Sequence, residues 1–337
     1  MRTLFSIFMI FVLLFGLSLP ASGAQQANAN WQTAKEASLD WLYSNITPGP
    51  AVGSVGGEWS VIALARAGHV SADDPWVRAY IRDLNRTIRE VNGLTRQGYN
   101  VNRPPSAGTF PSALRRWTDF QRVTLALTAL GLDASDYLSQ DLTAIFSTYT
   151  SISRRHSLNQ TISADIFALI ALNSNAYRGN REPFIQSILN AQRTNGTWGL
   201  GTTPTAMDVD TTAMAIQALA PYYGSNTDVT AAVDLALTWL RRQTFSNPEG
   251  TAQMIVALSA LGPDFADEAE TYVNILLRWF NPRTGGFGRG GQNAANDPVN
   301  MMATEQAAYA LVAFYRLVND MTSLYDMSDA FGSGGGA

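Results

Sequence analysis

The chain has 337 residues, of which 46% are hydrophobic and 15% charged, and this composition predicts a large buried core rather than a disordered chain. The net charge is only −4 and the basic residues are scattered along the sequence, which argues against nucleic-acid binding. Cysteine is absent and the two histidines are far apart, so thiol chemistry is excluded and no metal site is expected.

The first predicted element is a secretory signal peptide at residues 1–24. Arg2 is followed by an apolar run over residues 4–19 and then by small residues. The apolar run is shorter than the roughly 20 residues that a membrane-spanning helix needs, and polar residues and glycine interrupt it. We therefore expect cleavage without a stable transmembrane anchor, a short linker at 25–30, and a secreted or cell-envelope protein.

Six alanine-rich apolar segments follow along the chain, each with alanine directly before its centre. The centres are Leu64, Leu127, Leu169, Ile216, Leu258 and Leu311. Six amphipathic segments alternate with them, at 31–46, 74–91, 135–150, 181–192, 229–243 and 265–280. We predict an all-α fold, a single α/α toroid of six helix pairs with about twelve helices over residues 31–326 and the alanine-rich helices inside. Residues 327–337 are expected to form a flexible glycine-rich tail.

Two motifs resemble known families. Gln192, Gly196 and Trp198 have the order Q-x3-G-x-W, which resembles the QW repeat of the squalene cyclase and protein prenyltransferase superfamily. The segment DVDTTAMA at 208–215 resembles the D-x-D-D-T-A acid motif of class II terpene cyclases. It also resembles the V-D-T-x-A-M-A segment of the animal cobalamin carriers, transcobalamin and intrinsic factor. Residues 302–329 resemble secreted bacterial proteins with prenyltransferase and squalene oxidase repeats, and all these resemblances imply a toroid.

The repeats place polar residues at one mouth of the predicted ring. Six positions before the repeat centres stand Glu58, Gln121, Asp210 and Glu305, among others. Each position falls in a first helical turn, where an acid favourably meets the helix dipole, so a purely structural role is the alternative. Asp208, two residues before Asp210, fits a helix cap best.

Aromatic residues lie beside the same predicted mouth. Trp59, Trp198 and Phe287 can stack on a ligand, or they can pack over the joints between helices. Together with the polar residues at the mouth they are the candidate ligand-binding residues.

Three functions are compatible with these observations. The first is a secreted toroid that binds a small hydrophobic or cofactor-like ligand, such as a corrinoid or an isoprenoid, or a cell-envelope partner, at the mouth with Glu58, Asp210 and Glu305. The second, which the resemblance implies, is a terpene-cyclase-like enzyme with Asp210 as the general acid. The third is a carbohydrate-active toroid enzyme that uses paired carboxylates. The sequence alone leaves open whether the protein is an enzyme, and no cofactor is required.

Overall fold

The computed structural model describes residues 23–96, 114, 116–147, 161–201, 208–290 and 297–334. Over these residues the chain forms twelve α-helices and several short 3-10 helices, with one isolated β-bridge and no strand. The predicted all-α class and the number of helices are thus confirmed. None of the helices in this part of the chain is long and apolar enough to cross a membrane. The signal peptide predicted at 1–24 lies almost wholly outside the described residues.

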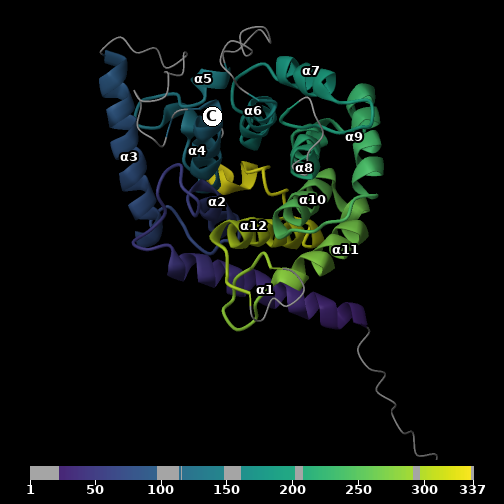
Figure 1. The fold of residues 1–337 in the computed structure, drawn as a ribbon. Helices are drawn as coiled ribbons and strands as arrows, with labels where there is room; N and C mark the ends of the chain where they lie inside the picture. Colours follow the sequence, from purple (N-terminus) through teal and green to yellow (C-terminus); the bar gives the residue numbers. More distant parts are fainter. Residues whose placement is uncertain are drawn as a thin grey trace, which may run out of the picture.

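Six helices form the inner layer of the molecule. They are α2 (Glu58–Arg66), α4 (Trp117–Ala129), α6 (Ser163–Ser174), α8 (Asp208–Leu219), α10 (Pro248–Leu261) and α12 (Met301–Val318). Each contacts the next one in this order, and α12 contacts α2, so the six helices close a ring (Figure 1).

The alanine before each repeat centre explains this packing. All six are fully buried: Ala63, Ala126, Ala168, Ala215, Ala257 and Ala310. A methyl side chain lets the backbones of neighbouring helices approach closely, so the repeated alanine is what allows six helices to fit around one axis.

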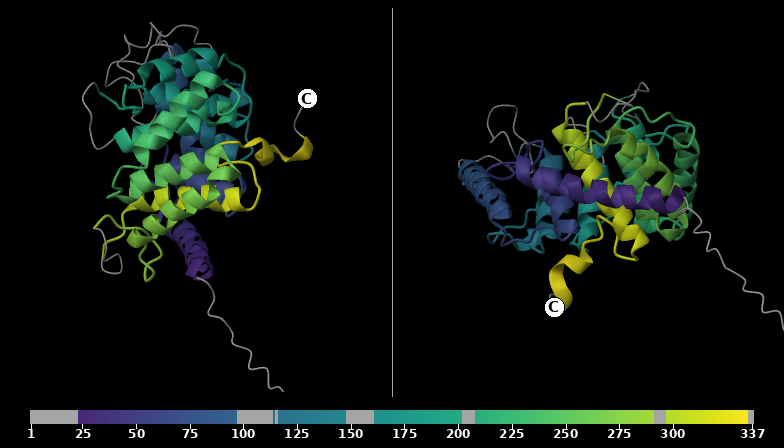
Figure 2. Two further views of the ribbon diagram at one scale, coloured as in Figure 1. Left: turned by 90° about the vertical axis from the view of Figure 1, so that its right-hand side faces the viewer. Right: turned by 90° about the horizontal axis from the view of Figure 1, so that it is seen from below.

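The remaining helices form the outer layer (Figures 1 and 2). They are α1 (Gly23–Asn45), α3 (Pro75–Arg96), α5 (Ala144–Ser147), α7 (Glu182–Ala191), α9 (Thr227–Leu240) and α11 (Ala266–Leu276). On α3 the buried residues recur at helical spacing, as amphipathic packing requires: Val77, Tyr80, Leu84, Ile88 and Val91. The stretch 25–30, expected to be a linker, belongs to α1.

The helix predicted at 135–150 does not form as one element. The structure has a 3-10 turn at Ala134–Asp136 and the single turn α5, and its description of this region ends at residue 147. Between the two turns Leu138 and Ser139 have φ values of 53° and 59°, which an α-helix cannot include. Leu142, Ile145 and Phe146 are buried as the amphipathic pattern predicts, but Leu138 is exposed, because the local backbone geometry overrides the pattern there.

The C-terminal segment also differs from the prediction, because its first part is bound to the ring rather than free. Met327 is fully buried, and its N–H donates to the Ser174 carbonyl oxygen at 2.8 Å. Residues Ser328–Gly334 form a 3-10 helix that projects from one face of the ring (Figure 2). Residues 335–337 lie outside the described residues.

Candidate functional site

Two of the predicted carboxylates bind a loop at the mouth formed by the N-terminal ends of the inner helices. Glu58 on α2 and Glu305 on α12 are 1% and 2% exposed. Glu58 Oε1 accepts a hydrogen bond from the Gly53 N–H at 2.8 Å. Glu305 Oε2 accepts from the Gly56 N–H at 2.7 Å and from the Ser60 hydroxyl at 3.2 Å. These two carboxylates therefore hold the loop before α2 in place.

Burial governs the protonation of both groups. It raises the pKa of Glu58, although the Arg122 guanidinium, whose Nε lies 3.8 Å from Glu58 Oε2, acts in the opposite direction. Burial also raises the pKa of Glu305 to about 7, with Glu58 raising it further and the bonds from Gly56 and Ser60 opposing the rise. Close to neutral pH, Glu305 therefore exists in both protonation states.

Asp210, in the first turn of α8, has a different environment. It is partly buried and accepts no hydrogen bond from any residue in the described part of the chain. A Cβ added to Gly250 would come within 2.9 Å of Asp210 Oδ1, so this oxygen lies against the first turn of α10. Burial is the larger cause and the negative charge of Glu249 the smaller cause of a rise in the pKa of Asp210 to about 6. Of the predicted carboxylates, Asp210 thus has an oxygen that is not used by the fold and a pKa close to neutrality, which a proton donor or a ligand contact requires.

Asp208 and Gln121 hold elements of the fold together. Asp208 is 2% exposed and forms an ion pair with Arg193, whose Nη2 also donates to the Gly201 carbonyl oxygen at 2.6 Å. This ion pair holds the loop before α8 against the helix. It is an interaction of Asp208 beyond the helix cap that the sequence predicts for this residue. Gln121 on α4 is fully buried, and its Nε2 donates to the Ala164 carbonyl oxygen on α6 at 2.8 Å.

Trp198 and Phe287 pack between helices, and both rings are fully buried. Both residues also make the same kind of backbone hydrogen bond. The backbone N–H of Trp198 donates to the Thr212 hydroxyl at 3.0 Å, and the backbone N–H of Phe287 donates to the Thr304 hydroxyl at 2.9 Å. Each aromatic residue thus fastens its loop to the first turn of the next inner helix. Of the two roles considered for Trp198 and Phe287, stacking on a ligand or packing between helices, the structure has them packing between helices.

Trp59 keeps some exposure inside the ring. Its ring centroid lies 5.5 Å from that of Phe167 on α6 and 5.9 Å from that of Tyr309 on α12, both in tilted orientations. Side chains from three inner helices therefore meet at an aromatic cluster.

A cavity of about 730 Å³ lies toward the opposite mouth, where α6, α8 and α10 end. Its walls include Ile170, Asn173, Gln217, Ala260, Tyr325 and Asp326. None of these residues was predicted as a site residue. Gln217 did carry a signal, since it places a polar side chain directly after the repeat centre, inside an otherwise apolar run.

Two amide groups in the cavity wall are only partly satisfied. Gln217 is 4% exposed, and its Nε2 donates to the carbonyl oxygen and the Oε1 of Gln253, both at 2.9 Å. These bonds fix the amide orientation and leave Gln217 Oε1 without a donor among the described residues. Asn173 Oδ1 accepts from Arg181 Nε at 3.3 Å and from the Tyr222 hydroxyl at 3.1 Å, while its buried Nδ2 has no acceptor among the same residues. One unpaired acceptor and one unpaired donor therefore lie behind the cavity wall, and a ligand reaches them only when these side chains turn toward the cavity.

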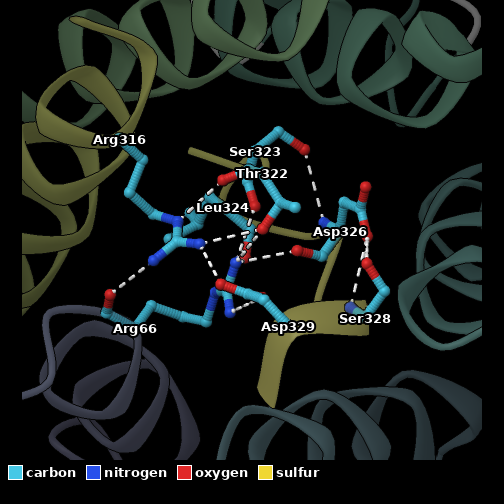
Figure 3. Close-up of polar contacts among 8 residues, drawn as sticks. All are labelled: Arg66, Arg316, Thr322, Ser323, Leu324, Asp326, Ser328 and Asp329. Carbon is cyan, nitrogen blue, oxygen red and sulfur yellow. Dashed lines mark hydrogen bonds and ion pairs between the residues drawn. The ribbon is translucent and has the colours of Figure 1, made fainter. Parts of the chain in front are cut away.

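The chain beyond α12 supplies a further part of the wall, and two buried arginines hold this segment in place (Figure 3). Arg66 donates to the carbonyl oxygens of Leu324 at 3.0 Å, Ser323 at 3.0 Å and Asp326 at 2.7 Å. Arg316 donates to the Thr322 carbonyl oxygen at 2.7 Å. Because both arginines belong to the last turns of inner helices, this segment is a fixed wall of the cavity.

Comparisons with family models, curated proteins and solved structures gave no match to this chain. Among the described residues, no group of three or more histidine, aspartate or glutamate side chains is arranged to hold a metal ion. The cavity and the side chains around it are therefore the features that indicate a function.

Proposed function

We propose that the protein binds a small organic molecule in the cavity at the C-terminal ends of α6, α8 and α10. The observation that carries this proposal is a cavity lined by Gln217 and Asn173, two residues that each keep an unpaired amide atom, Gln217 Oε1 and Asn173 Nδ2, buried just behind the cavity surface. An unpaired buried polar group costs roughly 1–3 kcal/mol, and a ligand that pairs with it recovers part of that cost. A cavity volume of about 730 Å³ lies in the usual range for small-molecule sites.

The lining defines the chemistry of the ligand. Ile170, Ala218, Pro221 and Ala260 present apolar surface, so the body of the ligand is apolar. The acceptor on Gln217 and the donor on Asn173 match a group that carries both an N–H and a C=O, such as an amide or a lactam. A corrinoid has amide side chains of this kind, whereas an isoprenoid hydrocarbon would use only the apolar wall.

Matched probes test the proposal. N-benzylacetamide carries the N–H and the C=O, while N-benzyl-N-methylacetamide lacks the N–H. We expect the first to bind and the second to bind roughly fivefold more weakly, because about 1 kcal/mol of hydrogen bonding to Gln217 Oε1 is lost. Binding is measured by NMR titration of the folded protein.

A variant and its control complete this test. Gln217→Met should reduce the affinity for N-benzylacetamide to that of the methylated analogue. Gln32→Met, at an exposed position of α1, should bind both probes as the wild type does. Equal binding of N-benzylacetamide to the wild type and to Gln217→Met would contradict the proposed recognition.

A second candidate function uses Asp210 as a general acid, in the manner of a terpene cyclase. It is favoured by the absence of a hydrogen-bond donor to Asp210 among the described residues and by a pKa raised to about 6. Wild type and Asp210→Asn are compared for turnover of a terpenoid epoxide. Loss of product with unchanged folding supports this candidate, and no turnover by the wild type rules it out. The same two proteins assayed on a polysaccharide panel test a carbohydrate-active enzyme that pairs Asp210 with Glu249.

We also propose that the protein acts outside the cytoplasm, on the evidence of the charged, apolar and small-residue order of residues 1–24. Expression in a secreting host should give a mature N-terminus close to Gln25. Recovery of intact Met1 in the cytosol would contradict secretion.

A further inference from the structure

Two buried arginines converge on one carboxylate at the mouth where α2 and α12 end (Figure 3). The side chains of Arg66 and Arg316 are each 3% exposed. Arg66 Nη1 lies 2.6 Å from Asp329 Oδ1, and Arg316 Nη2 lies 2.5 Å from Asp329 Oδ2. Each carboxylate oxygen therefore has its own guanidinium, and charge-assisted hydrogen bonds of this kind are the strong ones by which arginines bind carboxylates and phosphates.

The arginines are positioned by bonds that do not involve this carboxylate. Besides its bonds to main-chain oxygens of the C-terminal segment, Arg66 donates to the Thr322 hydroxyl at 3.0 Å. Arg316 donates to the same hydroxyl at 2.8 Å and, through Nη1, to the Arg66 carbonyl oxygen at 3.0 Å. The guanidinium groups would therefore keep their places if Asp329 moved away. Burial is the larger cause and the positive charge of Arg316 the smaller cause of a lowered pKa of Arg66. An anion between the two guanidinium groups therefore relieves a repulsion between two buried cations.

The occupant itself is held much more loosely than the arginines. The Asp329 side chain is 38% exposed, and the last fully buried residue before it is Met327. Beyond Met327, the Ser328 N–H and hydroxyl bond to the exposed Asp326 carboxylate, and the Ala330 N–H donates to the Met327 carbonyl oxygen at 2.9 Å. Ala330 also packs against the core beside Gly131, so displacing Asp329 requires the last described residues to lose this contact, without opening the ring.

We propose that Arg66 and Arg316 form a binding site for an external oxyanion, a carboxylate or a phosphate, and that Asp329 occupies this site when no such ligand is bound. The tail competes as an intramolecular ligand, whose effective concentration is in the millimolar range for a short flexible connection. An external oxyanion must therefore exceed that concentration or bring further contacts. The proposal does not depend on occupancy of the cavity.

The first test is chemical rescue of the full-length Asp329→Ala variant. Removal of the carboxylate should lower Tm by about 5–10 °C, because two buried cations lose their shared partner. Acetate or phosphate at tens of millimolar should restore most of this loss, and sodium chloride at the same ionic strength should not. Separate acetate and phosphate titrations show which oxyanion the site prefers. Asp264→Ala, which removes an exposed carboxylate outside this cluster, is the control and should show no rescue.

The second test uses the wild type and does not depend on the variant folding. Acetate or phosphate should increase hydrogen exchange of the Ala330 amide several-fold and leave the Met327 amide, which is bound to Ser174, unchanged. Equal rescue by chloride, or no rescue at all, means that charge screening or lost packing explains the variant. Rescue of the variant without faster exchange of the Ala330 amide in the wild type means that the tail is a permanent part of the fold. Either result overturns the proposal.

Discussion

Glu305 should make the stability of this protein depend on pH in the range where most carboxylates have no effect. The pKa of Glu305 rises from 4.5 to about 7 on folding, so the folded protein binds a proton that the unfolded chain has released. The contribution of the neutral Glu305 side chain to the free energy of unfolding is therefore fully present below about pH 4.5 and is lost as the pH rises through about 7. The difference between these two pKa values corresponds to about 3 kcal/mol. Glu305 is 2% exposed, so screening by solvent reduces this little.

The substitution Glu305→Gln isolates this effect. Glutamine keeps an oxygen that can accept from the Gly56 N–H and the Ser60 hydroxyl, but it has no charge to bury. We expect the variant to match the wild type at about pH 4.5 and to exceed it by up to about 3 kcal/mol at about pH 8, or about 6–12 °C in Tm. Urea and thermal unfolding at both pH values measure the difference. Contributions from other carboxylates cancel because both proteins contain them.

The control is Glu182→Gln, which removes an exposed glutamate in the first turn of α7. It reports the general effect of losing one negative charge. If the stability difference between Glu305→Gln and the wild type is the same at both pH values, the buried carboxylate is ionised throughout and the reasoning is wrong.

Three further predictions concern other parts of the ring. Asp210→Asn should stabilise the protein at about pH 8 by at most about 3 kcal/mol, a maximum that solvent screening of this partly exposed carboxyl lowers, and have no effect at about pH 4, because its pKa rises from 3.8 to about 6; urea unfolding at both pH values checks this. Trp198→Phe should cost about 1–3 kcal/mol, since the indole N–H that donates to the Ile188 carbonyl oxygen at 2.6 Å is lost; a cost below a few tenths in urea unfolding would contradict it. Arg66→Met should cost about 3–5 kcal/mol because it leaves Asp329 and several carbonyl oxygens short of donors, and a thermal scan with unchanged Tm would show that the segment is not anchored there.

The inner ring could be predicted from the sequence because its determinants are local and repeated. Alanine before each centre, with apolar residues at helical spacing around it, specifies a helix that is buried and closely packed wherever the chain places it. The same reasoning failed at 135–150, where Leu142, Ile145 and Phe146 are buried but Leu138 is exposed, and Leu138 and Ser139 adopt positive φ values. A hydrophobic pattern reports which side chains are buried and says little about a single turn of backbone.

The site was predicted only in part. Glu58 and Asp210 lie in the first turns of inner helices, as the alignment of the repeats indicates, whereas Glu305 is one turn further along α12. Which of them remains without a hydrogen-bond donor depends on loops that fold over them from elsewhere, such as the one that brings Gly56 to Glu305. The cavity lies at the other mouth and could not be predicted from the sequence. Its walls combine three helix ends with the C-terminal segment, and no single stretch of sequence contains that combination.

By itself the sequence determined the helical class, the six-fold alternation of inner and outer segments, and the burial of the alanines, because each depends on residues within a turn or two of one another. The tertiary structure alone decided the partners of the charged groups. Arg66 and Asp329 are 263 positions apart, yet they meet because closure of the ring brings the end of α2 beside the end of α12. Electrostatic pairing depends on distance in space, and closing the ring is what converts a separation along the chain into a contact.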